Sequence, residues 1–468
     1  MEDSLPMWYV NDELGSAIQH DNDPSFRIVP FIHLPQQTTY SLLFPIKDTE
    51  MGDTIYRDYC EAVKKEDPLK ELLMLPWQPA SFRHKSFNQV EPDTKYFLDG
   101  HIKETLPDKF ARPPVVDANR PLRVYSDYEY VTKYLTDPSF EILGEDEKSE
   151  EADIYWFTKH FKGYQEFSQN YPNKFVNQFP FENVITIKDL LSIVCRRTTK
   201  VPTDPETLMT FPKWLPTTYN LKTELQEFVS YYQHREDKKM DNHWIIKPWN
   251  LARSLDTTIT SNLSEIIRLS QTGPKIVQKY VEKPLLFHRP SSGGKVKFDV
   301  RYVILLKNID ELEVYVYKNF FLRFSNIPFE MNQFDVYEKH FTVMNYDENF
   351  VLQHLKCEEF LDEWKDQYGE FPWEDIETDI CDMLKDMFLG ATKENPPKGI
   401  CASPQSRALY AADIMLSIED GKVQPKLLEC NWTPDCKRAC EYYPEFYNDI
   451  FKLMFLNQDN HCVFRRVA

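Results

Sequence analysis

The sequence predicts an α+β protein, in part α/β, built from several layers and more than one domain. Its 468 residues are enough for two to four domains at roughly 100–200 residues per domain. Hydrophobic residues make up 42% of the chain and charged residues 28%, which provides a sizeable core and excludes a mainly disordered chain. From Pro121 onward, short apolar strands alternate with amphipathic helices, and this alternation is typical of an α/β layer with a parallel sheet.

The net charge of the chain indicates which kinds of molecule it binds. Lys and Arg number 55 against 74 Asp and Glu, which gives a net charge of −19 and a pI near 5.1. A field of this sign argues against general nucleic-acid binding, so no direct nucleic-acid partner is expected. Only 12 residues are glycine, which disfavours any function that depends on a glycine-rich phosphate loop.

The N-terminus and the cysteines indicate a compartment. Residues Met1 to Val10 are acidic and lack the long apolar run of a signal peptide. We find no stretch near the ~18 uninterrupted apolar residues that a membrane helix needs. The nine cysteines are scattered and odd in number, which is typical of a reduced intracellular chain. We therefore expect a cytosolic protein with no membrane partner.

Four of these cysteines and one histidine gather near the C-terminus, namely Cys430, Cys436, Cys440, Cys462 and His461. None of them has the CxxC spacing that lets two thiolates reach one zinc ion. Free buried thiols are therefore predicted instead of a zinc site.

The first region, up to about Asn119, contains short apolar runs broken by Pro and Asp. These runs predict strands of an irregular antiparallel β unit, at Met7–Val10, Arg27–His33 and Tyr40–Ile46. The last run leads into a turn at Asp48–Asp53. Because the region carries no catalytic signature, it is predicted to be an appended β-rich domain over residues 1–119.

The middle region, residues 120–215, is predicted to be a small α/β lobe. Its expected strands are Leu122–Tyr125, Phe140–Leu143 and Ala152–Phe157, and its expected helices are Tyr128–Leu135 and Thr186–Arg196. The second helix places Leu190, Leu191 and Val194 on one face. The acidic run Glu145–Glu151 is expected to be a solvated loop.

The last region, residues 216–468, mixes long strands with helices. The predicted strands are His243–Lys247, Lys275–Val281, Lys297–Lys307, Glu311–Tyr317, Ala408–Ser417 and Lys426–Glu429. The predicted helices are Leu221–Tyr232, Leu263–Ser270, Glu358–Tyr368, Trp373–Leu389 and Glu445–Leu456.

The densest chemical signal lies near the C-terminus. Asp413 lies within an apolar strand, and after a turn the return strand ends with Glu429 and Asn431. On antiparallel neighbours this spacing puts three oxygen ligands on one face. Such hard donors suit Mg²⁺, which is usually completed by waters and substrate phosphates. Ordinary polar residues on an exposed sheet face are an equally good explanation of the pair alone.

A second signal is an alternation of charge. Period two places Lys297, Asp299 and Arg301 on one face of a long strand, with apolar residues on the other. A solvated face explains such a pattern more often than a site does. Two further cations favour a site, because Lys247 ends one strand and Arg323 lies in another. Cations that converge on a carboxylate–Mg²⁺ centre are what polyphosphate binding requires.

Together these segments form an ordered set of motifs. In chain order they are Asn242–Pro248, Ile276–Val281 with Pro284–Leu286, Lys297–Arg301, and Leu428–Asn431 before Pro434. This set resembles the tubulin–tyrosine ligase family, whose catalytic unit is a two-lobed ATP-grasp fold. Pro216–Leu221, and Asn177–Pro180 followed by Lys188, fit the same pattern, and the resemblance spans roughly Pro121 to Leu456. It implies that residues 1–119 are a partial SET-like domain and that residues 216–468 form the central and C-terminal ATP-grasp lobes.

The resemblance implies a role for each motif residue, with ATP and Mg²⁺ as cofactors. Gln278, Lys279 and Tyr280 match the hinge that reads adenine. Lys188 and Lys247 match the lysines that contact phosphates, and Asp413, Glu429 and Asn431 match the metal ligands. The floor of the site, where nucleotide and acceptor meet, is matched by Lys297, Asp299, Arg301 and Arg323. The implied reaction joins an amine to a carboxylate through an acyl phosphate.

One departure from the family pattern affects the expected activity. Family members generally carry a glycine-rich loop after the Lys-Pro pair, whereas residues Trp249 to Leu255 contain no glycine. Backbone amides approach phosphate best where Cβ atoms are missing, although Arg253 offers a charge in this loop. The sequence therefore favours a nucleotide-binding regulatory relative slightly over an active ligase, and an interaction protein without nucleotide comes third.

The implied partner is tubulin or another protein with an acidic tail. An acidic acceptor needs a basic groove, and the one local basic cluster near the expected cleft is Arg196, Arg197 and Lys200. A solvated helix end explains this cluster at least as well. The resemblance also implies a cytoplasmic protein associated with microtubules or the centrosome.

Overall fold

The computed structural model describes residues 13–117, 119–144, 151–249, 255–342 and 355–468, and the chain forms two compact units. Unit 1 comprises Met1–Gln89, Tyr219–Asn242 and Thr260–Val277. Unit 2 comprises Val90–Thr218, His243–Ile259 and Gln278–Ala468. Both units combine separate stretches of the chain, so the domain boundaries at 119/120 and 215/216 stay a prediction. The expected strand Met7–Val10 and nearly all of the expected loop Glu145–Glu151 lie outside the described residues.

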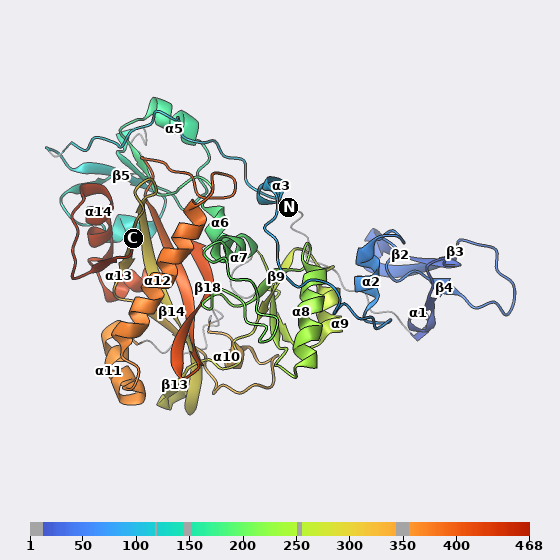
Figure 1. Cartoon of the computed structure of the whole chain (residues 1–468). Helices are drawn as coiled ribbons and strands as arrows, with labels where there is room; N and C mark the ends of the chain where they lie inside the picture. The colour runs from blue at the N-terminus through green and yellow to red at the C-terminus, as the bar shows by residue number, and fades with distance from the viewer. Residues whose placement is uncertain (1–12, 118, 145–150, 250–254, 343–354) are drawn as a thin grey trace. The chain divides into compact units, whose positions relative to one another are not determined.

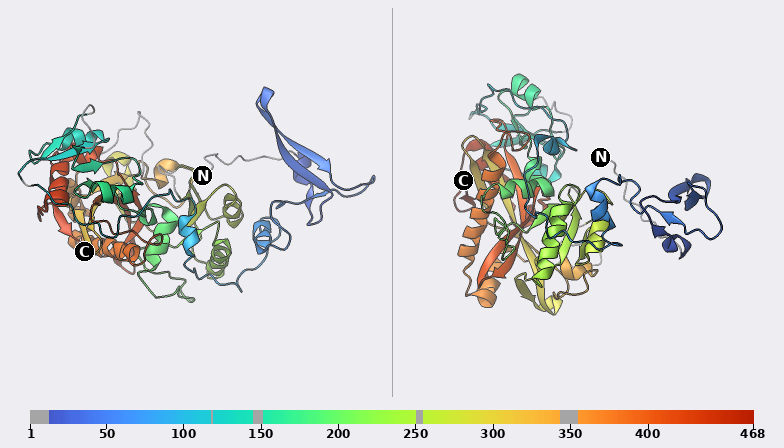
Figure 2. Two further views of the ribbon diagram at one scale, coloured as in Figure 1. Left: turned by 90° about the horizontal axis from the view of Figure 1, so that it is seen from above. Right: turned by 45° about the vertical axis from the view of Figure 1, so that its right-hand side comes forward.

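Unit 1 contains short strands and helices. They are α1 (Glu13–Ala17), β1 (Gln19–His20), β2 (Phe26–His33), β3 (Thr38–Pro45), β4 (Tyr56–Arg57), α2 (Pro68–Met74), α8 (Leu225–Asp237) and α9 (Leu263–Leu269). β2 and β3 pair along their whole length as an antiparallel ribbon, as predicted (Figure 2). β1 and β4 pair in parallel, and α1 and α2 are helices that the strand pattern did not predict. In both helices only five to seven residues are helical, which is too short for a clear 3.6-residue period.

A small parallel layer opens unit 2. It has the strand order β6-β5-β7-β8 and only parallel pairs, which confirms the predicted α/β layer. Its elements, with the helices that accompany them, are α3 (Thr94–Leu98), β5 (Leu122–Ser126), α4 (Glu129–Tyr134), β6 (Phe140–Ile142), β7 (Ile154–Trp156), α5 (Tyr164–Asn170) and β8 (Phe175–Val176).

The predicted helix at Thr186–Arg196 is two helices, α6 (Asn183–Thr186) and α7 (Lys188–Arg196), separated by extended Ile187. α7 is buried on more than its apolar face, since Asp189 is buried as well. The Asp189 carboxylate accepts a hydrogen bond from the Tyr96 hydroxyl at 2.6 Å. The first residue of α7 is Lys188, so the break at Ile187 places this lysine at the start of a fixed helix.

A seven-stranded sheet forms the centre of unit 2. Five strands follow the order β18-β17-β14-β15-β19, and β13 and β16 also pair with β14. Their bounds are β13 (Leu286–Arg289), β14 (Gly294–Asn308), β15 (Glu313–Tyr317), β16 (Phe321–Phe324), β17 (Ala408–Glu419), β18 (Lys422–Trp432) and β19 (Phe464–Arg466). The long pairings β14–β17 and β17–β18 are antiparallel, as the sequence predicted for the last two strands.

Helices cover both faces of this sheet. They are α10 (Tyr337–His340), α11 (Cys357–Tyr368), α12 (Trp373–Thr392), α13 (Lys437–Tyr442) and α14 (Phe446–Leu456). α12 runs along the sheet in Figure 1 and shares a core with the even-numbered residues of β14, such as Phe298 and Val300. α14 packs on the other face with Val303 and Leu305. The odd face of β14 is therefore apolar in its second half and charged in its first half, where Lys297, Asp299 and Arg301 lie.

A four-stranded sheet has the order β11-β10-β12-β9. Its strands are β9 (Thr218–Asn220), β10 (Trp244–Pro248), β11 (Thr258–Thr260) and β12 (Lys275–Lys279), and the division of the chain into units falls within β9, β11 and β12. β10 ends at Pro248 directly after Lys247, and β12 ends at Lys279 directly before Tyr280.

The cysteines are all within the described residues, and all nine are free thiols. Cys430, Cys436 and Cys440 are buried as predicted, whereas Cys462 is exposed. No helix in the described part of the chain combines the length and apolarity needed to cross a membrane.

Candidate nucleotide site

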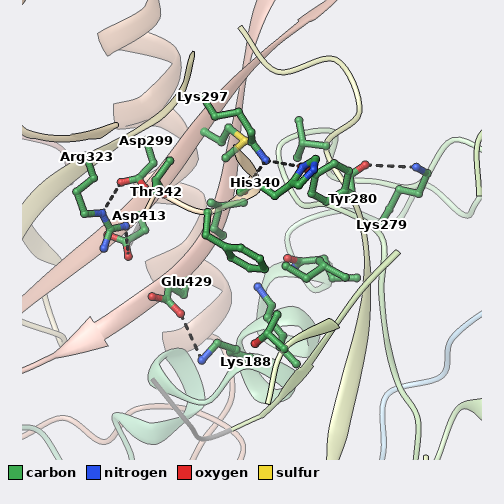
Figure 3. Close-up of a pocket in the computed structure, with 18 residues that line it drawn as sticks. Lys188, Lys279, Tyr280, Lys297, Asp299, Arg323, His340, Thr342, Asp413 and Glu429 are labelled. Atoms are coloured by element: carbon green, nitrogen blue, oxygen red, sulfur yellow. Dashed lines mark hydrogen bonds and ion pairs between the residues drawn. The ribbon is translucent and has the colours of Figure 1, made fainter. Parts of the chain in front are cut away.

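A pocket with about 860 Å³ of empty volume lies within unit 2. The lining comes from β10, β12, β14, β16, β17, β18, the start of α7 and the segment that ends at Thr342 (Figure 3). The polar lining residues are Lys188, Lys247, Thr257, Gln278, Lys279, Tyr280, Lys297, Asp299, Arg323, His340, Thr342, Asp413 and Glu429. Most of the predicted site residues therefore meet in one cavity.

The floor of the pocket is a row of charges on directly opposed strand positions. Asp299 on β14 lies opposite Arg323 on β16, and Arg301 lies opposite Asp413 on β17. Arg323 Nε donates to Asp299 Oδ1 at 2.8 Å. Arg301 binds Asp413 through two hydrogen bonds, Nε to Oδ1 at 2.7 Å and Nη2 to Oδ2 at 2.9 Å. The period-two prediction for β14 thus gave the correct face.

Asp413 is the centre of this row. Its side chain is 1% exposed, and Arg323 Nη2 lies 2.7 Å from its Oδ2 in addition to the paired Arg301. Burial raises the pKa of this carboxyl, but the two guanidiniums outweigh burial and hold the pKa well below its usual range. For Asp299, burial dominates and raises the pKa, although Arg323 and the Thr342 hydroxyl donate to it. The floor is therefore a charge network satisfied by its own members.

A β-bulge shapes the wall opposite the floor. Asp413 pairs with Glu429, but the next residue, Ile414, pairs with Leu427, so Leu428 is an extra residue in β18. The bulge makes Leu428 and Glu429 both line the pocket. Asn431 lies beside both carboxylates, because its Nδ2 is 3.4 Å from Asp413 Oδ2 and 3.3 Å from Glu429 Oε1. The three predicted metal ligands are thus adjacent.

Two lysines approach the carboxylates from other elements. Lys188 Nζ lies 3.3 Å from Glu429 Oε2, and its backbone N–H donates to the Trp249 carbonyl at 3.1 Å. This backbone hydrogen bond therefore holds the first turn of α7 against the start of the glycine-free loop that begins at Trp249. At Lys247, burial and the neighbouring Lys188 lower the pKa to about 8, while Glu429 and Asp413 oppose this shift. Arg253, the other cation predicted for this loop, lies outside the described residues.

The three predicted hinge residues line the pocket and are held by local contacts. The Gln278 side-chain amide donates to Thr218 Oγ1 at 2.9 Å, and the Tyr280 backbone N–H donates to the His243 carbonyl at 3.1 Å. Lys279 Nζ donates to the carbonyls of His243 and Tyr280 at 3.2 and 3.3 Å. These bonds hold the three hinge residues in place without a ligand.

Sequence reasoning assigned no role to two residues of the pocket wall, His340 and Thr342. Thr342 donates to Asp299, and the Tyr280 hydroxyl bonds His340 Nδ1 at 2.9 Å. Both lie in or just after α10, which is too short to give a periodic signal. Their roles depend on contacts with residues more than 40 positions away, which spacing within the motif does not reveal.

The basic cluster predicted near the cleft is largely structural. The Arg197 guanidinium pairs with both Glu91 oxygens at 2.9 Å and donates to the Lys398 carbonyl at 2.6 Å. Arg196 donates to Ser192 Oγ and to the Thr218 carbonyl. Lys200 is exposed. The two arginines therefore hold α7 in place and do not form a groove.

The donor set fits Mg²⁺. Two carboxylates and one amide lie on adjacent strands, and each carboxylate oxygen has two acceptor positions. The Asp413 oxygens already accept from guanidiniums, so Glu429, whose side chain is 25% exposed, is the most available ligand. Asn431 presents its oxygen after rotation of the amide. In the described part of the chain no trio of His, Cys, Asp and Glu is placed to hold a metal, so the amide is needed.

The fold and the site together define an ATP-grasp-type unit preceded by a SET-like region. The family model described as "Tubulin-tyrosine ligase family" matches residues 166–466, and the model "Tubulin tyrosine ligase SET-like domain" matches residues 1–81. The chain belongs to the tubulin–tyrosine ligase family.

Individual relatives agree with this assignment. The chain is 45% identical to tubulin–tyrosine ligase-like protein 12 of Mus musculus over 477 residues, covering 100% of this chain and 72% of the relative. It is also 45% identical to the Homo sapiens protein of the same name over 469 residues, covering 98% and 70%. A probable tubulin polyglutamylase of Mus musculus is 24% identical over 381 residues, covering 77% and 66%.

Proposed function

We propose that the pocket of unit 2 binds ATP with Mg²⁺ and that the chain acts on the modification of tubulin tails as a regulatory member of its family. The observation that carries the proposal is the composition of one cavity, which Lys188, Lys247 and Lys297 line together with the carboxylates of Asp413 and Glu429. Lysines facing hard oxygen ligands are the groups that a metal-bound polyphosphate needs.

The proposed roles follow from position. Lys188, Lys247 and Lys297 bind and orient the phosphates, and the hinge residues Gln278 to Tyr280 hold the base. Glu429, Asn431 and Asp413 would hold Mg²⁺, which when bound neutralises charge on the phosphates and polarises the transferred phosphoryl group. Arg301 and Arg323 keep Asp413 ionised and fixed, because they bind both of its oxygens.

A regulatory role is favoured over fast ligation by the loop after Lys247. Its sequence from Trp249 to Leu255 contains no glycine, and Trp249 is bonded to α7 through its carbonyl. Backbone amides that close over phosphates need either glycine or free peptide groups. Nucleotide binding with slow or absent turnover is the expected combination.

Binding is tested by calorimetry and thermal shift with Mg·ATP. A ligand at 100 times its Kd stabilises the native state by about 2.7 kcal/mol, so wild type should show a clear rise in Tm. Glu429→Gln and Lys247→Met should reduce that rise, whereas the exposed-site variant Lys200→Met should not. No shift with wild-type protein would overturn the proposal and favour an interaction protein without nucleotide.

An active ligase is the second candidate, favoured by the floor residues Lys297, Asp299 and Arg323, which all line the pocket. In that reaction the γ-phosphoryl group of ATP passes to a carboxylate, which gives an acyl phosphate and ADP. An amine then attacks the acyl carbon, phosphate leaves, and the amine loses a proton as the amide forms. Incorporation of labelled tyrosine or glutamate into tubulin that Glu429→Gln abolishes would establish this candidate over the regulatory one.

Tubulin is the proposed partner because the family and its named relatives are defined by tubulin modification. A cytoplasmic location with microtubule association belongs to the same proposal. Co-sedimentation with microtubules, compared with microtubules whose acidic tails have been removed, tests both the partner and the tail dependence.

A further inference from the structure

A chain of hydrogen bonds runs along the lining of the pocket between the hinge and the floor. Lys297 Nζ donates to the Tyr280 hydroxyl at 2.9 Å and to the His340 carbonyl at 3.1 Å. The Tyr280 hydroxyl meets His340 Nδ1 at 2.9 Å, and His340 Nε2 meets the Asn332 carbonyl at 2.8 Å. The chain therefore connects residues of β14, the hinge and α10 (Figure 3).

The partners fix the direction of each bond. An ammonium group only donates, so the Tyr280 oxygen accepts from Lys297 and its own proton is free to be donated to His340 Nδ1. A backbone carbonyl only accepts, so His340 Nε2 must carry a proton to bond Asn332. With Lys297 charged, His340 is therefore neutral, with its proton on Nε2.

Packing leaves these groups little freedom. His340 is 3% exposed, Lys297 2% and Tyr280 5%. The Lys297 ammonium also lies 4.4 Å from the centroid of the Tyr280 ring, and Phe334 stacks on the His340 ring at 4.9 Å. The neighbouring Lys339 is held by the side-chain oxygens of Asn332 and Gln333, both at 2.9 Å. A fixed chain of this kind sets where the lysine points.

We propose that His340 is a positioning residue, which as the neutral tautomer aligns the Tyr280 hydroxyl and through it holds the Lys297 ammonium toward the phosphates of a bound nucleotide. The inference rests on the proposed function, because it assigns Lys297 a nucleotide as its ligand. Lys297 directs two of its three N–H bonds at Tyr280 and His340 and also lines the pocket, which leaves the third for a ligand.

A pH dependence follows from the bond directions. In acid, a second proton on His340 Nδ1 would repel the proton of the Tyr280 hydroxyl and break the hydrogen bond between them. The Tyr280 hydroxyl would then no longer be fixed, and Lys297 would lose one of the groups that hold it in place. The groups that face His340 are Lys297 from β14, Tyr280 after β12 and Lys339 from its own helix, with Glu330 paired to Lys339 at 3.4 Å. Burial and the two lysines lower the pKa of His340, so the change should fall below the usual titration range of histidine.

The test measures Mg·ATP affinity from pH 5.5 to 8.5 with four proteins. His340→Asn retains an acceptor where Nδ1 lies but does not titrate, and we expect affinity within about threefold of wild type at pH 7.5 and no acid loss beyond that of ATP itself. His340→Leu and Tyr280→Phe break the chain, and each should bind about tenfold more weakly at pH 7.5. Wild type should show an extra acid loss that His340→Asn lacks.

A direct measurement covers the case in which a variant does not fold. Nitrogen NMR of histidine-labelled wild-type protein at pH 7.5 should show His340 protonated on Nε2 alone. Protonation on Nδ1 would overturn the inference, as would wild-type affinity in both His340→Leu and Tyr280→Phe. If wild type binds no Mg·ATP at any pH, both the proposed function and this inference fail. If wild type binds Mg·ATP and the variants bind it equally well, only the inference fails.

Discussion

In two β regions of this chain, burial does not follow the polarity of the side chains. β14 buries ionisable side chains, whereas the β2–β3 ribbon exposes apolar ones. On β14 the side chains of Lys297 and Asp299 are 2% and 0% exposed although both are ionisable. On the β2–β3 ribbon, Phe31 and Tyr40 are a directly opposed apolar pair, and each is 45% exposed. Leu42 and Phe44 extend that face of the ribbon, at 44% and 39% exposed.

The difference teaches that neighbours, and not the local pattern, decide burial. β14 lies between β16 and β17, whose Arg323 and Asp413 give Asp299 and Arg301 partners of opposite sign. Lys297 donates instead to the Tyr280 hydroxyl and the His340 carbonyl. A buried ion pair is tolerated only when such partners and hydrogen bonds are present. The β2–β3 ribbon has only two strands, and these apolar side chains on its faces are largely exposed, because burial of a sheet face requires a packed helix or second sheet.

The largest expected effect comes from removing the centre of the buried charge network. Asp413→Ala leaves Arg301 and Arg323 without their shared carboxylate, so we expect a loss of about 3–5 kcal/mol in the free energy of unfolding. Urea denaturation measures it, with Asp366→Ala on exposed α11 as the control. A loss below about 1 kcal/mol would show that these charges are solvated like those of a surface strand.

A second prediction concerns the ion pair between Lys188 and Glu429. A metal at Glu429 must displace the lysine, whereas nucleotide phosphate offers the lysine a new partner, so the two ligands should bind cooperatively. We expect nucleotide to tighten Mn²⁺ binding about tenfold, or about 1.4 kcal/mol. Lys188→Met should tighten Mn²⁺ binding without nucleotide, and Lys200→Met should not. Equal Mn²⁺ affinity with and without nucleotide contradicts this coupling.

Removing the buried ammonium should increase stability. Burial lowers the pKa of Lys297 to about 7 in the protein without nucleotide, with Asp299 opposing the shift, and a bound phosphate would raise this pKa and favour the ammonium form. Between that value and the unfolded pKa of about 10.4 the unfolded chain binds the extra proton, so the free energy of unfolding rises with pH in this window. Lys297→Met should remove this slope and stabilise the protein by about 1 kcal/mol at pH 7 while it weakens Mg·ATP binding.

The control for Lys297→Met is Lys295→Met, two positions earlier on the same strand but exposed. It should change neither the pH slope nor nucleotide affinity. Urea denaturation from pH 6 to 10 provides the measurement. If the free energy of unfolding of Lys297→Met still rises with pH in this window, the titrating group is not Lys297.

The smallest effect is expected on the β2–β3 ribbon. Because Phe31 and Tyr40 are already largely exposed, changing both to Ser should alter the free energy of unfolding by no more than about 0.5 kcal/mol. The change should instead reduce self-association in light scattering, since exposed apolar patches drive contacts between molecules. A loss comparable to that of Asp413→Ala would show that this face is covered in solution.

Much of the site was accessible from the sequence because strands impose a strict period of two. Lys297, Asp299 and Arg301 share a face for that reason. The tight turn between β17 and β18 sets a register that would place Asp413 opposite Leu428, and the bulge shifts the pairing so that Asp413 meets Glu429. The bulge at Leu428 was not predicted, since an extra residue leaves no mark in an apolar run. The short helices α1, α2, α6 and α10 were missed or misplaced because fewer than two turns give no clear periodicity.

The sequence by itself determined which residue types share a face and in what order the motifs follow, because side-chain direction along a strand is a local property of the backbone. Only the tertiary structure decided which charges neutralise one another, and that His340, Tyr280 and Lys297 form one chain. Those contacts join residues between 17 and 112 positions apart, as for Lys297 with Tyr280 and Arg301 with Asp413. Their strength depends on the exclusion of water, which no single segment of the chain can achieve.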